Sequence, residues 1–172
     1  GQRALVPSCA RPTEEGMVVE TDSERVKHSR KMVLEFLGSG VDLDQAPELQ
    51  KWMDHYGSDT SRYDQYELPA LRMDEAPKIQ DNLYIRDYDR CVLCYKCVEA
   101  CGDDAQHTYA IAVSGRGFDA RISTEFDVTL PDSACVYCGN CIGVCPTGAI
   151  QFKTEYDLRQ EDDWRPEDQD VT

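Results

Sequence analysis

Long apolar runs, a leader segment and an excess of positive charge are all missing from this 172-residue sequence. No uninterrupted apolar stretch exceeds about five residues, whereas a membrane-spanning helix needs about 20. No charged-then-apolar segment opens the chain. With 18 Lys and Arg against 33 Asp and Glu, the formal net charge is −15, which disfavours contact with nucleic-acid phosphates and anionic membranes. We therefore expect a soluble, intracellular protein that binds no nucleic acid and does not insert into a membrane.

Large apolar residues are also scarce. Leu, Ile, Val and Phe together make up 34 of the 172 residues, just under the fifth at which a highly charged chain begins to look disordered. The length suits one domain or two small ones. A core this small indicates that something besides apolar burial stabilises the fold. The sequence also lacks a nucleophile–base set and a phosphate-binding glycine loop, so we expect no catalytic centre in this chain.

Cysteine, by contrast, is abundant. Eight of the nine cysteines form two copies of the spacing C-x2-C-x2-C-x3-C, offset by 44 residues: Cys91, Cys94, Cys97 and Cys101, then Cys135, Cys138, Cys141 and Cys145. A disulfide framework is disfavoured because such scaffolds are small and secreted. Zinc sites usually pair two C-x2-C motifs and rarely continue as here. The run C-x2-C-x2-C-x3-C-P is typical of bacterial ferredoxins that hold two [4Fe–4S] clusters.

In that signature the fourth cysteine of each run binds the other cluster. One cluster should therefore bind Cys91, Cys94, Cys97 and Cys145, and the other Cys135, Cys138, Cys141 and Cys101. Pro146 suits the first turn of the helix after the second run, while the first run has Gly102 in its place. The interleaved ligands would add the folding energy that the core lacks. Structural zinc, in a protein whose acidic surface recruits partners, is the alternative.

Around the cysteines, the hydrophobic spacing predicts an α+β fold. A helix is predicted over 23–37, ended by Gly38, with an apolar set made of Val26, Met32, Val33, Phe36 and Leu37. A second helix should run from Pro47 to about Tyr56, with Leu49, Trp52 and Met53 on its buried side. Strands are predicted at 83–85, 109–113, 120–122 and 149–152, with a turn at 114–117. Residues 155–172 hold eight acids and two bases and are predicted to be a solvated tail or interdomain linker, ordered only against a catalytic partner or domain, with Trp164 as the apolar anchor.

The stretches "DRCVLCYKCVEAC" and "YAIAVSGRGFDARISTEFDVTLPDSACVYCGNCIGVCPTGAI" resemble the iron–sulfur relay region of cytoplasmic, NAD(P)-linked formate dehydrogenases that use molybdenum or tungsten. The piece "GRGFDARI" is the most discriminating. Similar modules occur in the large iron–sulfur subunit of complex I, which has usually lost three cysteines of the second run. They also occur in [FeFe] hydrogenases, which continue into their own catalytic cysteine motifs.

The segment "LVPSCARPTEEGMVVETDSERVKHSRKMVLEFL" is similar to the end of the plant-type [2Fe–2S] domain of these proteins and its linking helix. Cys9 matches the fourth ligand of that cluster, whose other ligands lie upstream in the family. The stretch "GSGVDLDQAPELQKWMDHYGSDTSRY" matches a region that usually holds another cubane through one histidine and three cysteines. It has no cysteine, with Pro47 at the position of the last one, so we expect that cluster to be absent; His55 lies outside the motif.

The resemblance implies four parts: a [2Fe–2S] domain remnant at 1–21, a helical connector without the family's cluster at 22–82, a duplicated, pseudo-two-fold module with two [4Fe–4S] clusters at 83–153, and an acidic linker or tail at 154–172. It implies a chain that passes electrons between a molybdopterin centre oxidising formate and a flavin/NAD module on partner chains. A relay for a hydrogenase or a complex-I-like dehydrogenase is the alternative. The choice of molybdenum or tungsten and the direction of electron flow stay open.

Overall fold

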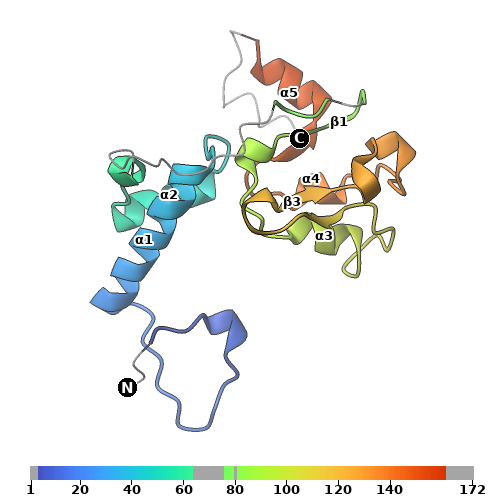
Figure 1. Ribbon diagram of the computed structural model, residues 1–172. Helices are drawn as coiled ribbons and strands as arrows, with labels where there is room; N and C mark the ends of the chain where they lie inside the picture. Colours follow the sequence, from blue (N-terminus) through green and yellow to red (C-terminus); the bar gives the residue numbers. More distant parts are fainter. Residues whose placement is uncertain (1–3, 64–75, 80, 162–172) are drawn as a thin grey trace.

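The structure, a computed structural model, describes residues 4–63, 76–79 and 81–161. Figure 1 shows an extended N-terminal segment, a helical unit and a cysteine-rich unit built of short helices and strands. Among the described residues no helix combines the length and apolarity that crossing a membrane requires. Trp164, predicted to be the apolar anchor of the acidic tail, lies outside the described residues.

The N-terminal segment has little regular structure. Its one short element is the 3₁₀ helix η1 (Ser8–Ala10), and nearly all of its side chains are exposed, including those of Leu5, Val18 and Val19. An ion pair of 2.9 Å between Arg11 and Glu14 is on the surface, where such pairs contribute little stability.

The helical unit consists of α1 (Glu24–Gly40), α2 (Pro47–Tyr56) and the 3₁₀ helix η2 (Thr60–Tyr63). Ser23 caps α1, because its hydroxyl accepts a hydrogen bond from the backbone N–H of Val26 at 3.4 Å. Pro47 is the first residue of α2, and Gly57 ends it in the left-handed conformation (φ 58°). The predicted bounds of α2 are confirmed.

Two details of the helical unit differ from the prediction. Gly38 does not end α1, which continues to Gly40. Instead, Gly38 lets α1 approach its neighbours: a Cβ there would overlap Cγ2 of Thr60 and lie 2.9 Å from Cε of Met53. Trp52, predicted to be buried, is 51% exposed, because it lies along the outer surface of α2 and stacks on Tyr56 with ring centroids 6.0 Å apart.

The buried side of α1 also differs from the predicted apolar set. Val33 and Phe36 are exposed, whereas Leu34, Glu35 and Ser39 are buried. Glu35 is fully buried because its carboxylate meets η2: it accepts hydrogen bonds from Arg62 at 2.8 Å and from the N–H of Asp59 at 3.2 Å. The ion pair and the backbone hydrogen bond replace the water that the carboxylate loses, so a charged residue occupies an interior position of the helix.

The cysteine-rich unit alternates short strands and helices. Its elements are β1 (Tyr84–Arg86), α3 (Lys96–Cys101), β2 (Ala112–Ser114), β3 (Arg121–Ser123), α4 (Asn140–Gly143), β4 (Ile150–Phe152) and α5 (Lys153–Arg159). β1 pairs antiparallel with β4, and β2 with β3. The four predicted strands are confirmed to within a few residues. β2 begins later than predicted, because Tyr109 has a left-handed backbone (φ 53°).

The helix α5 occupies part of the segment predicted to be a solvated tail. It packs against β4 and β1. Two ion pairs, each between residues one helical turn apart, stabilise it: Lys153 with Asp157 at 2.5 Å and Arg159 with Glu155 at 2.7 Å. Alternating charges at this spacing stabilise a helix even where apolar residues are few. The prediction for 155–172 is therefore wrong up to Arg159.

The core of the cysteine-rich unit is small. Its buried residues are Tyr84, Tyr88, Cys101, Ala110, Ile111, Ile122, Leu130 and Ile150, and Cys91, Cys97, Cys135 and Cys141 pack against them. The helical unit is joined to it by Asp42, whose N–H donates to the carbonyl of Asp89 at 2.8 Å and whose carboxylate pairs with Arg90 at 2.6 Å. The end of α1 therefore lies beside the first cysteine run.

Candidate metal centre

The two cysteine runs share one backbone conformation. Leu93 and Tyr137, which precede the second cysteine of each run, have φ of 52° and 55°. Tyr95 and Gly139, which follow it, have φ of 63° and 78°, and α3 and α4 begin directly after them. Left-handed non-glycine residues are strained by about 1–3 kcal/mol each and persist only where surrounding contacts enforce them. The 44-residue repeat is thus also a repeat of loop geometry.

These loops turn backbone N–H groups toward sulfur. The N–H of Leu93 donates to Sγ of Cys91, and the N–H of Tyr137, its counterpart in the second run, donates to Sγ of Cys135. Burial raises the pKa of both thiols, and each of these hydrogen bonds acts against that rise by stabilising the thiolate. Such donors favour a cysteine that binds iron as a thiolate.

Cysteines from both runs line one apolar cavity. Its sulfur-bearing residues are Cys91, Cys94 and Cys97 from the first run and Cys145 from the second. Apolar side chains, among them those of Tyr88, Ile122 and Ile150, surround them. The pKa of Cys97 is raised to about 12, chiefly by burial and then by the charges of Cys145 and Cys91.

The remaining cysteines of the two runs also interact with one another. The pKa of Cys141 is raised to about 12, chiefly by burial and then by the charges of Cys135, Cys138 and Cys101. Cys101 is itself buried at the end of α3. Cys145 thus shares a cavity with three cysteines of the first run, and the charge of Cys101 acts on Cys135 and Cys141 of the second. We refer to these two sets of four cysteines as the first and the second group.

This arrangement fits cubane clusters. Four thiolates in an apolar setting repel one another, so the cysteines ionise together only when a cation compensates their charge. A zinc ion needs its ligands around one point at 2.0–2.3 Å, and among the described residues no three His, Cys, Asp or Glu side chains converge in that way. In a cubane each thiolate binds a different iron, so its four sulfurs stand farther apart. The donors present are those that [4Fe–4S] clusters use.

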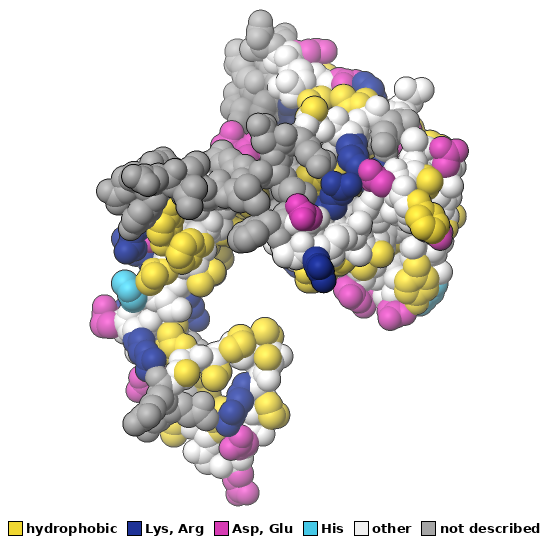
Figure 2. All heavy atoms as spheres, viewed as in Figure 1, with side chains coloured by type: hydrophobic (Ala, Val, Ile, Leu, Met, Phe, Trp, Pro, Cys, Tyr) yellow, Lys and Arg dark blue, Asp and Glu magenta, His cyan; other side chains and the backbone are white. Residues whose placement is uncertain are grey.

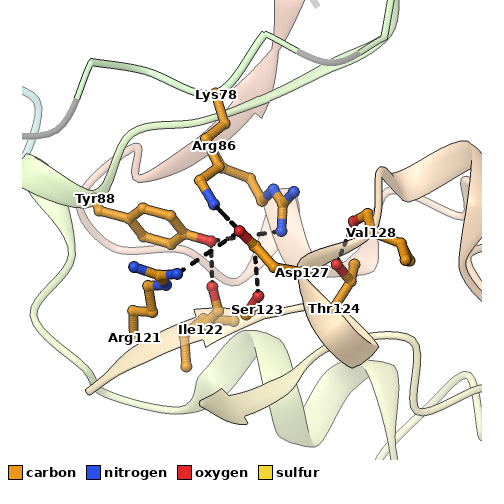
Figure 3. Close-up of polar contacts among 9 residues, drawn as sticks. All are labelled: Lys78, Arg86, Tyr88, Arg121, Ile122, Ser123, Thr124, Asp127 and Val128. Carbon is orange, nitrogen blue, oxygen red and sulfur yellow. Dashed lines mark hydrogen bonds and ion pairs between the residues drawn. The ribbon is translucent and has the colours of Figure 1, made fainter. Parts of the chain in front are cut away.

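Sequence reasoning missed a polar network beside the first group (Figure 3). Asp127 accepts hydrogen bonds from Lys78 at 2.7 Å and from Ser123 at 2.8 Å, and lies 3.7 Å from Arg121. The hydroxyl of Tyr88, a residue that lines the cavity, donates to the carbonyl of Ile122.

Arg86 of β1 belongs to the same network. Its side chain is 2% exposed and lies 3.4 Å from the Tyr88 hydroxyl. Nothing in the alternation of the strand predicts a buried arginine.

Other predicted site positions lie apart from these groups. Cys9 is exposed in η1, and residues 10–90 contain no further cysteine. Pro47 begins α2, and His55 is exposed on it, packed edge-on against Trp52 at 5.7 Å between ring centroids.

The comparison with protein families decides the nature of the cysteine-rich unit. The model of the 4Fe–4S dicluster domain matches residues 90–149. This part of the chain is a 4Fe–4S dicluster domain. The dicluster domain thus contains all eight repeated cysteines, and its mixed helix and small-sheet architecture is that of ferredoxins.

Relatives of the chain are parts of larger oxidoreductases. It is 38% identical over 157 residues to the NADP-reducing hydrogenase subunit HndD of Solidesulfovibrio fructosivorans. This match covers 87% of this chain and 26% of that protein. It is 36% identical over 156 residues to the 78 kDa subunit of the mitochondrial NADH-ubiquinone oxidoreductase of Candida albicans, covering 87% and 21%. A Staphylococcus haemolyticus protein, named provisionally as a formate dehydrogenase, is 29% identical, covering 83% and 15%.

A solved structure has the same fold. A chain of the NAD⁺-reducing [NiFe]-hydrogenase in the H₂-reduced state superposes with a TM-score of 0.69 at 25% identity, covering 84% of this chain and 62% of the other. By contrast, the chain spans only about a quarter or less of the length of each curated relative named above. The activities in those names belong to far longer proteins.

Proposed function

We propose that this chain is the electron-transfer part of an NAD-linked formate dehydrogenase, with two [4Fe–4S] clusters as its redox groups. In this proposal one cluster is bound by Cys91, Cys94, Cys97 and Cys145, and the other by Cys101, Cys135, Cys138 and Cys141. The observation that carries it is the meeting of two groups of four cysteines in one core. A [4Fe–4S] cluster takes up and releases a single electron.

The chain's own residues perform three tasks in this proposal. The loops with N–H groups aimed at Cys91 and Cys135 stabilise thiolates. The apolar residues around Cys97 and Cys141 exclude water, which strengthens every charge interaction at the clusters. Cys97 and Cys141 also lie within electrostatic reach of each other, so the two groups are close enough to exchange an electron.

The duplicated loops favour a pseudo-two-fold module within 83–153. Its ends differ, however. A groove at the first group is lined by Phe36 and Val41 at the end of α1 together with Cys91 and Leu93. The first group therefore faces the helical unit, which we infer to be the connector, at 22–82, to a [2Fe–2S] domain whose remnant is 1–21. Cys9 would complete that [2Fe–2S] site together with upstream cysteines.

For the partners, we infer a molybdopterin subunit or domain that oxidises formate and a flavin/NAD subunit. The support for formate is the stretch "GRGFDARI" and the likeness to the provisionally named formate dehydrogenase. The acidic surface is consistent with low-potential couples, because surrounding carboxylates disfavour the added negative charge of a reduced cluster.

A second candidate is a relay for a hydrogenase. It is favoured by the 38% identity to the NADP-reducing hydrogenase subunit and by the structural likeness to the NAD⁺-reducing [NiFe]-hydrogenase. The same iron–sulfur relay would serve either enzyme.

The deciding experiment is anaerobic reduction of the native complex that contains this chain. Formate should bleach the iron–sulfur absorbance near 420 nm, and metal analysis should find molybdenum or tungsten together with at least eight irons. Bleaching by H₂ but not by formate would assign the chain to a hydrogenase. A colourless, zinc-containing protein would overturn the relay altogether.

A further inference from the structure

One side chain in the dicluster domain stands out because it is almost fully in solvent. Phe126 is 91% exposed, in the 3₁₀ helix η5 (Glu125–Asp127), and its backbone is left-handed with φ 50°. An exposed aromatic ring loses the burial that usually stabilises it, and the backbone strain adds to that cost. Displaying this ring is therefore unfavourable for the isolated fold.

The structure nevertheless fixes the turn that presents Phe126. Asp127, also left-handed at φ 57°, is held by Lys78 and Ser123 in the network of Figure 3. On the same turn the hydroxyl of Thr124 donates to the carbonyl of Val128. Because residues on both sides are anchored, Phe126 cannot relax inward without breaking these contacts.

Phe126 borders a hollow that apolar and acidic side chains line together. The hollow is lined by Tyr109, Ala110, Glu125, Phe126, Val128, Asp132, Ser133 and Ala134, with no Lys or Arg among them. The exposed hydroxyl of Tyr109 donates to Asp103, which adds another carboxylate. In Figure 2 hydrophobic and acidic side chains alternate along the edge of the cysteine-rich unit farthest from α1 and α2.

The hollow adjoins the second cysteine group. Ser133 and Ala134, which line it, directly precede Cys135, and the Ser133 hydroxyl accepts a hydrogen bond from the Cys135 N–H at 3.1 Å. The groove at α1, by contrast, reaches Cys91 of the first group. The Phe126 hollow thus adjoins the second group, whereas the groove at α1 adjoins the first.

We propose that this hollow is the docking face for a redox partner protein that accepts or supplies electrons at the second cluster. The partner's matching surface has an apolar pocket for the Phe126 ring, surrounded by Lys and Arg side chains that meet Glu125, Asp132 and Asp103. Aromatic anchors in a desolvated centre dominate such interfaces, and opposite charges around them raise the association rate. This inference rests on the proposed electron-transfer function.

The test measures electron transfer from the reduced holoprotein to cytochrome c, a basic protein whose lysines surround an apolar haem edge. One electron leaves a reduced cluster, which returns to its oxidised state, and the ferric haem becomes ferrous. Phe126→Ala should lower the second-order rate constant at least tenfold. Glu125→Gln combined with Asp132→Asn should flatten its dependence on ionic strength. Leu158→Ala, which removes another exposed apolar side chain, on α5 (52% exposed), is the control and should leave the rate unchanged.

The outcomes separate the inference from the function beneath it. If wild type and Phe126→Ala reduce cytochrome c equally at all salt concentrations, while dithionite bleaches both at 420 nm, the docking face is refuted and the relay stands. If the wild-type protein binds no cluster, the docking face and the electron-relay function are both refuted. A wild-type dimer in sedimentation that Phe126→Ala abolishes would assign the hollow to a second copy of this chain and overturn the redox-partner role.

Discussion

Cys101 and Cys145 each end one cysteine run, yet each lies with the other run's cysteines in space. Cys145 lines the cavity of Cys91, Cys94 and Cys97, and Cys101 interacts with Cys135 and Cys141. If the ligand sets follow these groups, single substitutions should pair across the sequence. Single cysteine substitutions therefore test directly which four cysteines bind each cluster.

We expect Cys101→Ser to alter the same electron paramagnetic resonance signal as Cys138→Ser, and Cys145→Ser the same signal as Cys94→Ser. The physical reason is that replacing one thiolate perturbs only the cubane that it binds. Spectra of the dithionite-reduced variants, recorded beside a Cys9→Ser control, provide the measurement. The ligand assignment fails if Cys101→Ser instead reproduces the Cys94→Ser spectrum.

Glu35 provides a second test at this scale. Burial raises its pKa, but the hydrogen bonds from Arg62 and Asp59 and the charges of Arg62 and Lys31 outweigh that effect, so the pKa is lowered. A carboxylate with a lowered folded pKa adds stability above its ordinary pKa of about 4.3, and the contribution is lost as pH falls through the folded value.

Glu35→Gln should therefore destabilise the protein at pH 7 by about 2 kcal/mol, the scale of a charged hydrogen bond. The difference from wild type should be unchanged at pH 5 and shrink below about pH 4. Urea unfolding after rapid pH jumps, followed by Trp52 fluorescence in a Trp164→Phe background, measures it. A difference that grows toward low pH would contradict the assigned ion pair.

At the scale of elements, Gly38 decides how α1 meets η2 and α2. Alanine there would gain up to about 1 kcal/mol of helix propensity. It would also place a Cβ against Cγ2 of Thr60 and Cε of Met53, and overpacking of this kind destabilises by about 1–3 kcal/mol. Packing should outweigh propensity.

We expect Gly38→Ala to lower the free energy of unfolding in urea. Thr60→Ser removes the Cγ2 that the new Cβ would overlap. In a Thr60→Ser background, Gly38→Ala should therefore cost much less stability than it does in the wild type. A stabilising Gly38→Ala would show that the helices separate freely and that the close approach is unimportant.

At the scale of the whole molecule, the eight repeated cysteines and the core cannot be separated. Cys101 is a core residue, and other cysteines of both groups pack against Tyr84, Tyr88 and Ile150. With so few large apolar residues in the chain, metal binding should contribute much of the folding free energy.

Removing iron with ferricyanide and a chelator should therefore unfold the dicluster domain. A thermal scan from about 25 °C upward should then show no cooperative unfolding transition. Circular dichroism measures the loss, and adding iron and sulfide under reducing conditions should restore it. A metal-free protein that keeps the native spectrum and melting profile would show that the apolar core suffices.

The sequence alone determined the centre's composition, because a cluster's ligands are encoded in local spacing. The two cysteine runs and their 44-residue offset predicted the 4Fe–4S dicluster domain, and α2 and the four strands followed from proline and apolar patterning. The ligand sets stay a prediction, although the structure groups the cysteines accordingly.

Only the tertiary structure decided which charged and apolar side chains are inside. Glu35 and Arg86 are buried while Phe36, Trp52 and Phe126 are exposed, and no local pattern indicates this. The buried Glu35 depends on Arg62, 27 residues away, and the Asp127 that holds the Phe126 turn depends on Lys78, 49 residues away. A charge becomes favourable in the interior only when a distant partner replaces its water, and that partner is known only once the chain has folded.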